Sequence, residues 1–350
     1  MNILIDTSPL ATGHAIRGIG IYTRLLTESL EKLKGINVCK SADLETKKTF
    51  KPDIVHYPYF DFFFNTLPLI SRYNRVVTIH HVIPLKFPLA YSPGKRGRLI
   101  FQKQKLALKK VQAVITDSQA SKQDIVELLH VEEKKVHVVY LAGNPELRAI
   151  KDKKVIEAVK LKYNLPDKYI LYVGDINYNK NIPQLIKALK FLPEQVQLVC
   201  VGKNFREQNI PEWLAIEAQI ALSDVAKRIH FLPEITGDAN EELSVIYTGA
   251  FAYIQPSLAE GFGLPVLEAM QTHTPVVCTH NSSLIEVGGD HVIFVQTEAE
   301  SIAYGISELL TWSQTKRAAW TRDARKWATK FNWEKTAKET LKVYQKIVTH

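Results

Sequence analysis

The chain has 350 residues, a net charge of +9 and a composition of 46% hydrophobic and 23% charged residues, which is ordinary for a globular protein of two domains. It contains no run of about 18 apolar residues, so no transmembrane helix is predicted, and its first residues lack the charged and apolar regions of a signal peptide. Its three widely spaced cysteines match neither a disulfide framework nor a zinc-binding spacing, which favours a reducing cytoplasm.

The first part of the chain alternates short apolar runs with amphipathic stretches. This pattern predicts strands at 2–6, 53–58, 75–81, 113–118 and 135–141, and helices at 20–33 and 120–130. Strands that alternate with helices in this way are typical of a mostly parallel sheet that is covered on both faces.

The alternation stops between residues 142 and 168, where the chain is polar, rich in lysine and interrupted by two prolines. We place the domain boundary here, with a first domain at 1–150 and a second at 151–330. The second domain has predicted strands at 169–175, 196–202, 228–234, 251–257, 274–280 and 291–296. The sequence therefore predicts an α/β fold of two Rossmann-like, doubly wound parallel-sheet domains facing a cleft. Ligands of such sheets bind outside the carboxyl ends of the strands.

A basic stretch, KRGRLIFQKQKLALKK at 95–110, carries seven basic residues and no acid. Such a charge attracts nucleic acid, an anionic membrane surface or a phosphorylated acceptor. The alternative is a solvated helix face with an apolar underside of Leu99, Leu106 and Leu108. Nucleic-acid binding would leave the second domain unexplained, so we expect none and keep peripheral membrane contact as the open alternative.

The stretch SLAEGFGLPVLEAM at 257–270 places two glutamates, Glu260 and Glu268, eight residues apart. Its two glycines and its proline exclude one continuous helix, so the acids lie on different elements. A strand end, a glycine turn and a helix that begins near Pro265 form an arrangement that binds phosphate. The acids would repel phosphate but accept hydrogen bonds from hydroxyl groups, which suits a nucleotide sugar. The alternative is a plain tight turn with surface acids.

This stretch resembles the E-x7-E motif of retaining GT-B glycosyltransferases of family four. The resemblance implies that Glu260 contacts the transferred hexose and that Glu268 holds the ribose hydroxyls of the donor. It also implies that the backbone between them holds the diphosphate, at Gly261, Phe262, Gly263 and Leu264.

Further segments extend the resemblance over nearly the whole chain. YVGDINYNKNIPQLIKAL resembles the loop with a diphosphate-binding lysine, here Lys180, and TIHHVIP resembles the loop with a histidine beside the donor sugar, here His80. RGIGIYTRLL resembles the first glycine loop, which implies that Gly18 and Gly20 lie near the reaction centre. FNWEKTAKETLKVY resembles a closing helix, here within 331–350, that packs towards the first domain.

The chain departs from the family pattern at the phosphate clamp. GDINYNK lacks the arginine that often precedes the lysine, so Lys203 becomes a candidate for the second cation. No Asp-x-Asp occurs, and adjacent histidines on a strand would point to opposite faces, so we expect no metal and no cofactor. The sequence GIGIYT lacks the third glycine of a dinucleotide fingerprint, which makes a dehydrogenase a weak alternative.

The resemblance implies a retaining, metal-independent hexosyltransferase of polysaccharide biosynthesis, in the cytoplasm or at the inner face of the membrane. HHVIPLKFP and GDINYNKNIPQLI look similar to the mannosyltransferases of bacterial surface polysaccharide synthesis, so GDP-mannose is the first donor expected. A carbohydrate or a lipid-linked acceptor would receive the sugar. The alternatives are a nucleotide-sugar epimerase, a sugar-phosphate-forming enzyme of the same fold, or a catalytically silent carbohydrate- or nucleic-acid-binding protein.

Overall fold

The structure, a computed structural model, describes residues 1–11, 18–42 and 50–349. The chain divides into two compact units, one formed by Met1–Ala142 with Phe331–His350 and the other by Gly143–Lys330. The first unit is thus built from both ends of the sequence, whereas the second is one continuous segment. The boundary set from the sequence lies at residue 150.

The first unit contains a six-stranded sheet in which every neighbouring pair is parallel. Its strand order is β2 (Asn37–Ser41), β1 (Asn2–Asp6), β3 (Ile54–Tyr57), β4 (Asn74–Thr78), β5 (Ala113–Thr116) and β6 (Val136–Val138). The helices are α1 (Gly18–Glu31), α2 (Ile83–Lys86), α3 (Lys95–Leu108), α4 (Gln119–Leu129) and α13 (Trp333–Val348).

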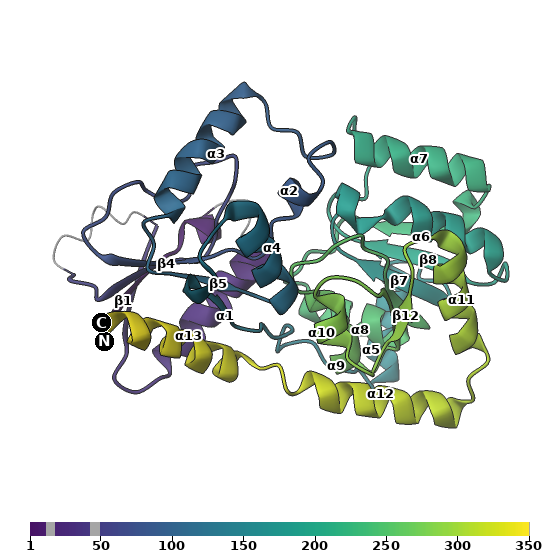
Figure 1. Ribbon diagram of the computed structural model, residues 1–350. Helices are drawn as coiled ribbons and strands as arrows, with labels where there is room; N and C mark the ends of the chain where they lie inside the picture. Colours follow the sequence, from purple (N-terminus) through teal and green to yellow (C-terminus); the bar gives the residue numbers. More distant parts are fainter. Residues whose placement is uncertain (12–17, 43–49, 350) are drawn as a thin grey trace. The chain divides into compact units, whose positions relative to one another are not determined.

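Helices cover both faces of this sheet. One face packs its apolar side chains against Leu108 of α3 and Ile125 of α4. The other face lies under α1 and α13, where Tyr344 of α13 hydrogen-bonds to His56 of β3 at 2.6 Å. Figure 1 shows α13, in yellow, among the purple and blue elements of the same unit.

The second unit repeats the architecture with another six-stranded parallel sheet. Its strand order is β12 (Ile293–Val295), β11 (Val276–Thr279), β10 (Ala252–Gln255), β7 (Tyr169–Val173), β8 (Gln197–Val201) and β9 (Ile229–Leu232). Its helices are α5 (Lys153–Lys162), α6 (Ile182–Ala188), α7 (Pro211–Ser223), α8 (Asn240–Gly249), α9 (Leu264–Gln271), α10 (Leu284–Gly288), α11 (Ala299–Leu310) and α12 (Gln314–Ala328).

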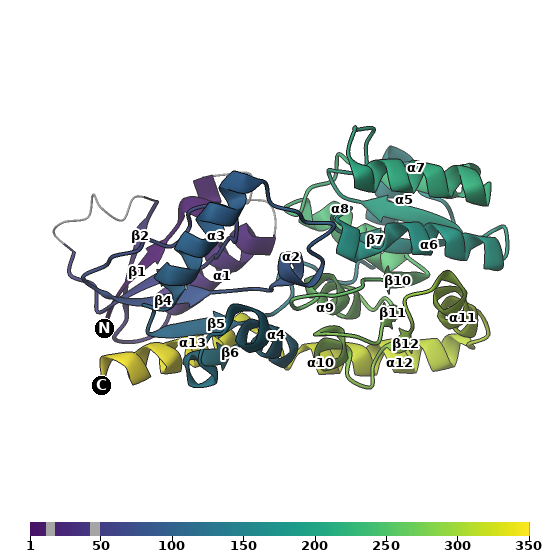
Figure 2. The same cartoon turned by 45° about the horizontal axis from the view of Figure 1, so that its top comes forward.

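The core of the second unit lies between its sheet and the helices α6, α7 and α11 (Figure 2). Buried side chains of these helices, among them Leu185, Ile216 and Ile306, pack on alternate residues of the strands. Helix α9 packs against α8 and also against α12. The predicted α/β fold with two doubly wound parallel sheets is confirmed.

One predicted strand is too long, and two elements of the fold were not predicted. The strand predicted at 75–81 ends at Thr78, so His80 and His81 lie beyond it and the argument from opposite faces of a strand does not apply to them. The sequence pattern missed strand β2 and helix α5, which lies inside the polar stretch at 142–168. Within the described residues, no helix combines the length and the apolar character needed to cross a bilayer.

Candidate active site

The glycine turn after β10 forms as the sequence predicts. Strand β10 ends at Gln255 and helix α9 begins at Leu264, with Pro265 in its first turn. Gly263 caps the helix with a φ of 103°, a conformation that side-chain-bearing residues rarely adopt, and a Cβ there would lie 2.8 Å from a methyl group of Leu284. The N-terminal N–H groups of a helix lack intrahelical partners and, with the helix dipole, favour an anion.

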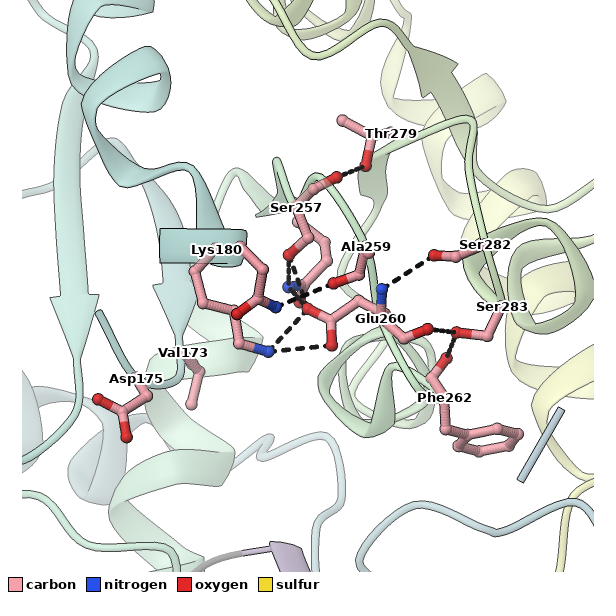
Figure 3. Close-up of polar contacts among 12 residues, drawn as sticks. Val173, Asp175, Lys180, Ser257, Ala259, Glu260, Phe262, Thr279, Ser282 and Ser283 are labelled. Carbon is pink, nitrogen blue, oxygen red and sulfur yellow. Dashed lines mark hydrogen bonds and ion pairs between the residues drawn. The ribbon is translucent and has the colours of Figure 1, made fainter. Parts of the chain in front are cut away.

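Glu260 lies in this turn and forms an ion pair with Lys180 (Figure 3). The ammonium nitrogen of Lys180 is 2.7 Å from Oε1 and 3.0 Å from Oε2 of Glu260. The two side chains are 20% and 8% exposed, so the pair is largely withdrawn from water but open on the lysine side. The structure therefore brings together two of the three residues predicted to be catalytic.

The loop after β7 carries Lys180 and is tied to the turn after β10, because these two strands are neighbours in the sheet. The side-chain amide of Asn179 donates to the carbonyl of Ala259 at 2.9 Å, and the amide of Leu258 donates to the carbonyl of Asn179 at 2.7 Å. Asn181, in the left-handed region with a φ of 59°, donates to the carbonyl of Pro256 at 3.0 Å. These bonds fix the lysine backbone next to Glu260.

Two serines that follow β11 hold the main chain of the turn. The backbone N–H of Glu260 donates to Oγ of Ser282 at 2.9 Å, and the hydroxyl of Ser283 lies 3.1 Å from the carbonyl of Glu260 and 2.9 Å from that of Phe262. Figure 3 shows both serines reaching the turn from the neighbouring segment. The candidate phosphate-binding residues, Gly261 to Leu264, thus belong to the turn after β10. Hydrogen bonds from the loops that follow β7 and β11 hold the backbone of this turn.

Glu268 lies in the second turn of α9, where the hydroxyl of Tyr247 donates to its Oε2 at 3.0 Å. Burial raises the pKa of Glu268 to about 7, although hydrogen bonds from Tyr247 and from the backbone of Asn144 oppose the rise. Burial therefore favours the protonated form of Glu268 more strongly than in a solvated glutamate. An arriving hydroxyl donor would favour the ionised form, because a hydrogen bond to a carboxylate stabilises its charge.

Lys203 lies directly after Gly202 at the carboxyl end of β8. Its loop is tied to the loop of Lys180, since the amide of Asn204 donates to Oδ1 of Asp175 at 2.6 Å. A Cβ at Gly202 would fall 2.0 Å from the carbonyl oxygen of Gly174, so only glycine permits this approach. The ammonium of Lys203 pairs with no carboxylate in the part of the chain that the structure describes, which leaves it available for an anion.

His80, in the first unit, has both ring nitrogens in hydrogen-bonding contact with its own unit. Nδ1 lies 2.7 Å from Oδ2 of Asp117, and Nε2 lies 3.2 Å from the carbonyl oxygen of Pro58. A carbonyl only accepts, so Nε2 carries a proton and a second proton lies between Nδ1 and the carboxylate. Burial opposes the charged form, but Asp117 outweighs it and raises the pKa of His80 above its ordinary value.

Gly18 and Gly20 lie in the first turn of α1 rather than in a loop. Gly18 is exposed and Gly20 is buried. One turn later, the ring of Tyr22 packs edge-on against His80 with 4.7 Å between the ring centroids. The preceding residues 12–17, which include the start of the predicted glycine motif, lie outside the described residues.

The residues that surround Glu260 and His80 were not predicted from the sequence. These are Tyr253, Gln255, Ser257, Ser282 and Ser283 around Glu260, and Asp117 beside His80. Asp117 directly follows β5, and Ser282 and Ser283 lie in the loop after β11. The rule that sites lie at the carboxyl ends of parallel strands would therefore have found these three residues. Among the described residues, no group of three or more His, Cys, Asp or Glu side chains is arranged to hold a metal ion.

Two family models match the chain. The model of the group 1 glycosyl transferases matches residues 152–327, and that of glycosyltransferase family 4 matches residues 16–146. The O-antigen chain mannosyltransferase B of Escherichia coli is 27% identical over 304 residues, which cover 85% of this chain and 75% of that protein. The O-antigen chain mannosyltransferase RfbU of Salmonella typhimurium is 27% identical over 67% of this chain and 60% of its own length.

Solved structures share the fold over the full length. A sucrose-phosphate synthase from Thermosynechococcus elongatus superposes with a TM-score of 0.74 at 19% identity and covers 99% of both chains. Anabaena HepE, in complex with UDP and glucose, gives a TM-score of 0.72 at 17% identity over 99% of this chain and 100% of its own. WaaG, a glycosyltransferase of lipopolysaccharide biosynthesis, gives 0.68 at 14% identity over 97% and 98%. Similarity at this level of identity shows the fold alone.

Proposed function

Since this chain belongs to the group 1 glycosyl transferases, we propose that it moves a hexose from a nucleoside diphosphate sugar to a hydroxyl group of a carbohydrate or lipid-linked acceptor. The observation that carries the proposal is the ion pair between Lys180 and Glu260 beside the glycine turn that begins α9. A cation and a helix N-terminus suit the diphosphate, while Glu260 suits a sugar hydroxyl.

The same residues support a metal-independent reaction with retention at the anomeric carbon. Lys180, the N-terminal amides of α9 and, as a second cation, Lys203 would stabilise the charge that develops on the leaving diphosphate. In a front-face displacement, the departing phosphate oxygen accepts the proton of the acceptor hydroxyl, so no side chain acts as general base. The contribution of the protein is then positioning and charge stabilisation.

GDP-mannose is the donor that we propose, and the names of both O-antigen relatives as mannosyltransferases support the choice of mannose. Incubation with UDP-, GDP- and ADP-sugars, followed by detection of released nucleoside diphosphate, tests this choice. We expect slow hydrolysis of GDP-mannose, unchanged by EDTA and accelerated by a polyprenyl-linked or free oligosaccharide acceptor. Epimerised donor, free sugar phosphate, or intact donors throughout would each replace the proposal with one of the alternatives. The family matches favour transfer over these alternatives.

The surface of α3 supports peripheral contact with an anionic membrane. Leu99 and Leu106 were expected on the apolar underside of the helix, but they are 74% and 55% exposed and only Leu108 is buried. Exposed leucines next to lysine and arginine side chains are typical of helices that lie at a lipid surface. Flotation with vesicles of neutral or anionic lipid tests this contact, and equal recovery with both would exclude electrostatic docking.

A further inference from the structure

Gln255 is a buried polar side chain in the centre of the second sheet, next to the candidate active site. It is the last residue of β10 and is only 1% exposed. Burying an amide without hydrogen-bond partners costs on the order of 1–3 kcal/mol, so its partners indicate why a polar residue is tolerated there. All of these partners belong to the short segment from Tyr253 to Glu260.

The hydroxyl of Tyr253 fixes the orientation of the Gln255 amide. Tyr253 is fully buried and donates its proton to Oε1 of Gln255. Nε2 of Gln255 therefore points the other way, where it donates to Oγ of Ser257 at 2.7 Å and to Oε1 of Glu260 at 2.8 Å. A flipped amide would place its carbonyl oxygen against the carboxylate of Glu260, which is repulsive.

Ser257 completes the arrangement, because its hydroxyl accepts from Gln255 and donates to Oε1 of Glu260 at 2.6 Å. Oε1 of Glu260 thus receives three donors, from Lys180, Gln255 and Ser257. Among the residues that the structure describes, Oε2 receives a hydrogen bond only from Lys180, at 3.0 Å, which leaves a lone pair for a further hydroxyl. The two carboxylate oxygens of Glu260 therefore differ, because Oε1 is held by the protein whereas Oε2 can accept a hydrogen bond from a ligand.

We propose that Gln255 is a positioning residue of the transfer reaction, which pins Oε1 of Glu260 so that Oε2 faces the hydroxyl of the transferred hexose. This inference rests on the proposed function. The backbone of Glu260 is held separately by Ser282 and Ser283. Loss of the Gln255 amide therefore removes one of the three donors to Oε1 and loosens the carboxylate, which keeps Lys180 and Ser257, without releasing the turn. The expected effect is on turnover more than on the Michaelis constant, since misplacement of a reacting contact by about 1 Å can cost up to 10²-fold in rate.

The test compares Gln255→Leu with the parent enzyme and with Thr274→Val, which removes another buried hydroxyl bond, from Oγ1 of Thr274 to the carbonyl of Tyr247 at 2.6 Å. We expect Gln255→Leu to lower kcat about tenfold with KM changed by less than about twofold, and to move the acid limb of the pH–rate profile to higher pH. Thr274→Val should leave the profile in place. An unchanged profile and kcat in Gln255→Leu would overturn the inference, as would an equal shift in the control.

Two additions keep the test decisive. If Gln255→Leu fails to fold, Tyr253→Phe removes only the hydroxyl that orients the amide and should give a smaller change in the same direction. A carboxyl ¹³C NMR spectrum needs no substrate, and we expect the Glu260 resonance to shift in Gln255→Leu, which loses a hydrogen bond to Oε1, but not in Thr274→Val. A shift without any glycosyl transfer by the parent enzyme would refute the proposed function and the positioning role but retain the buried network. No shift would refute the network itself.

Discussion

Each unit holds one ion pair at the carboxyl ends of its strands, and the two pairs differ in what they leave unused. In the first unit, His80 and Asp117 are 14% and 3% exposed, and both nitrogens of the histidine contact acceptors in the protein. The oxygen that stays without a hydrogen-bond partner among the described residues, Oδ1 of Asp117, is buried. In the second, within the described part of the chain, one N–H of the Lys180 ammonium and one lone pair of Glu260 Oε2 have no hydrogen-bond partner. A residue type that is common in active sites can therefore be committed to the fold, while a similar pair elsewhere stays available to a ligand.

The comparison predicts that the pair in the first unit contributes mainly to stability and that in the second mainly to activity. The catalytic role assigned to His80 stays a prediction, and it requires one ring nitrogen to exchange its present partner for the donor. The following variants test this division, from the largest expected effect to the smallest.

Replacing Asp117 by alanine should have the largest effect. It leaves the His80 ring buried without its carboxylate, and breaking a buried pair in this way costs about 3 kcal/mol or more of the free energy of unfolding. Urea unfolding measures the loss. The matched control is Asp124→Ala, which breaks the more exposed pair with Lys86 in the same unit and should cost less than about 1 kcal/mol. Equal costs would contradict the distinction between the two kinds of pair.

Replacing Lys180 by alanine should lower kcat on the order of 10²-fold, or about 2.7 kcal/mol, because the leaving diphosphate loses a cation. Stability should change little, since Gln255 and Ser257 still hold Glu260. The control is Lys187→Ala, which removes the exposed pair with Glu300 in the same unit and should keep parental turnover. Near-parental turnover in Lys180→Ala would remove this lysine from the site.

Replacing Glu268 by alanine should weaken the binding of the nucleoside diphosphate about tenfold, or 1.4 kcal/mol, through lost contacts to the ribose hydroxyls. Isothermal titration calorimetry measures the change. Inorganic diphosphate, which has no ribose, should bind the variant and the parent equally well. A similar loss for both ligands would place Glu268 at the phosphates instead.

The smallest expected effect is the pH dependence of stability due to Glu268. Its pKa is raised from 4.5 to about 7, so the folded state binds more protons than the unfolded state between these values. The free energy of unfolding contributed by this residue therefore rises as the pH falls from 7 towards 5. Over this pH range, we expect the free energy of unfolding to rise by about 1 kcal/mol relative to Glu268→Gln. The limit is about 1.4 kcal/mol for each pH unit, and the expected rise stays well below it because water screens this partly exposed group. Parallel curves for the two proteins would contradict the expectation.

The sequence predicted the local elements of the site because each has a local cause. Gly263 and Pro265 mark the end of a turn and the start of a helix, and the apolar runs mark buried strands. The pairing of Lys180 with Glu260 could not be predicted from spacing, since it depends on β7 and β10 becoming neighbours. The role of Gln255 could not be predicted either. Its hydrogen-bond partners become known only when β10, the turn that follows it and the loop with Lys180 are placed side by side.

The location of His80 shows the same limit. A histidine that follows a strand is a candidate site residue, because its ring can exchange protons. The sequence does not show that both ring nitrogens of His80 form hydrogen bonds with Pro58 and Asp117, because these residues are distant in sequence. Strand β4 also ends three residues earlier than predicted, so His80 lies beyond the strand and strand alternation does not set the direction of its side chain.

The return of Phe331–His350 to the first unit constrains the order in which the protein can be made. Domains of a growing chain generally fold as units from the N-terminus onwards. Here the ribosome must synthesise the whole second unit before Tyr344 can reach its buried partner His56. The N-terminal unit is therefore the last to be completed, and until then the face of its sheet on which α13 packs lacks that helix.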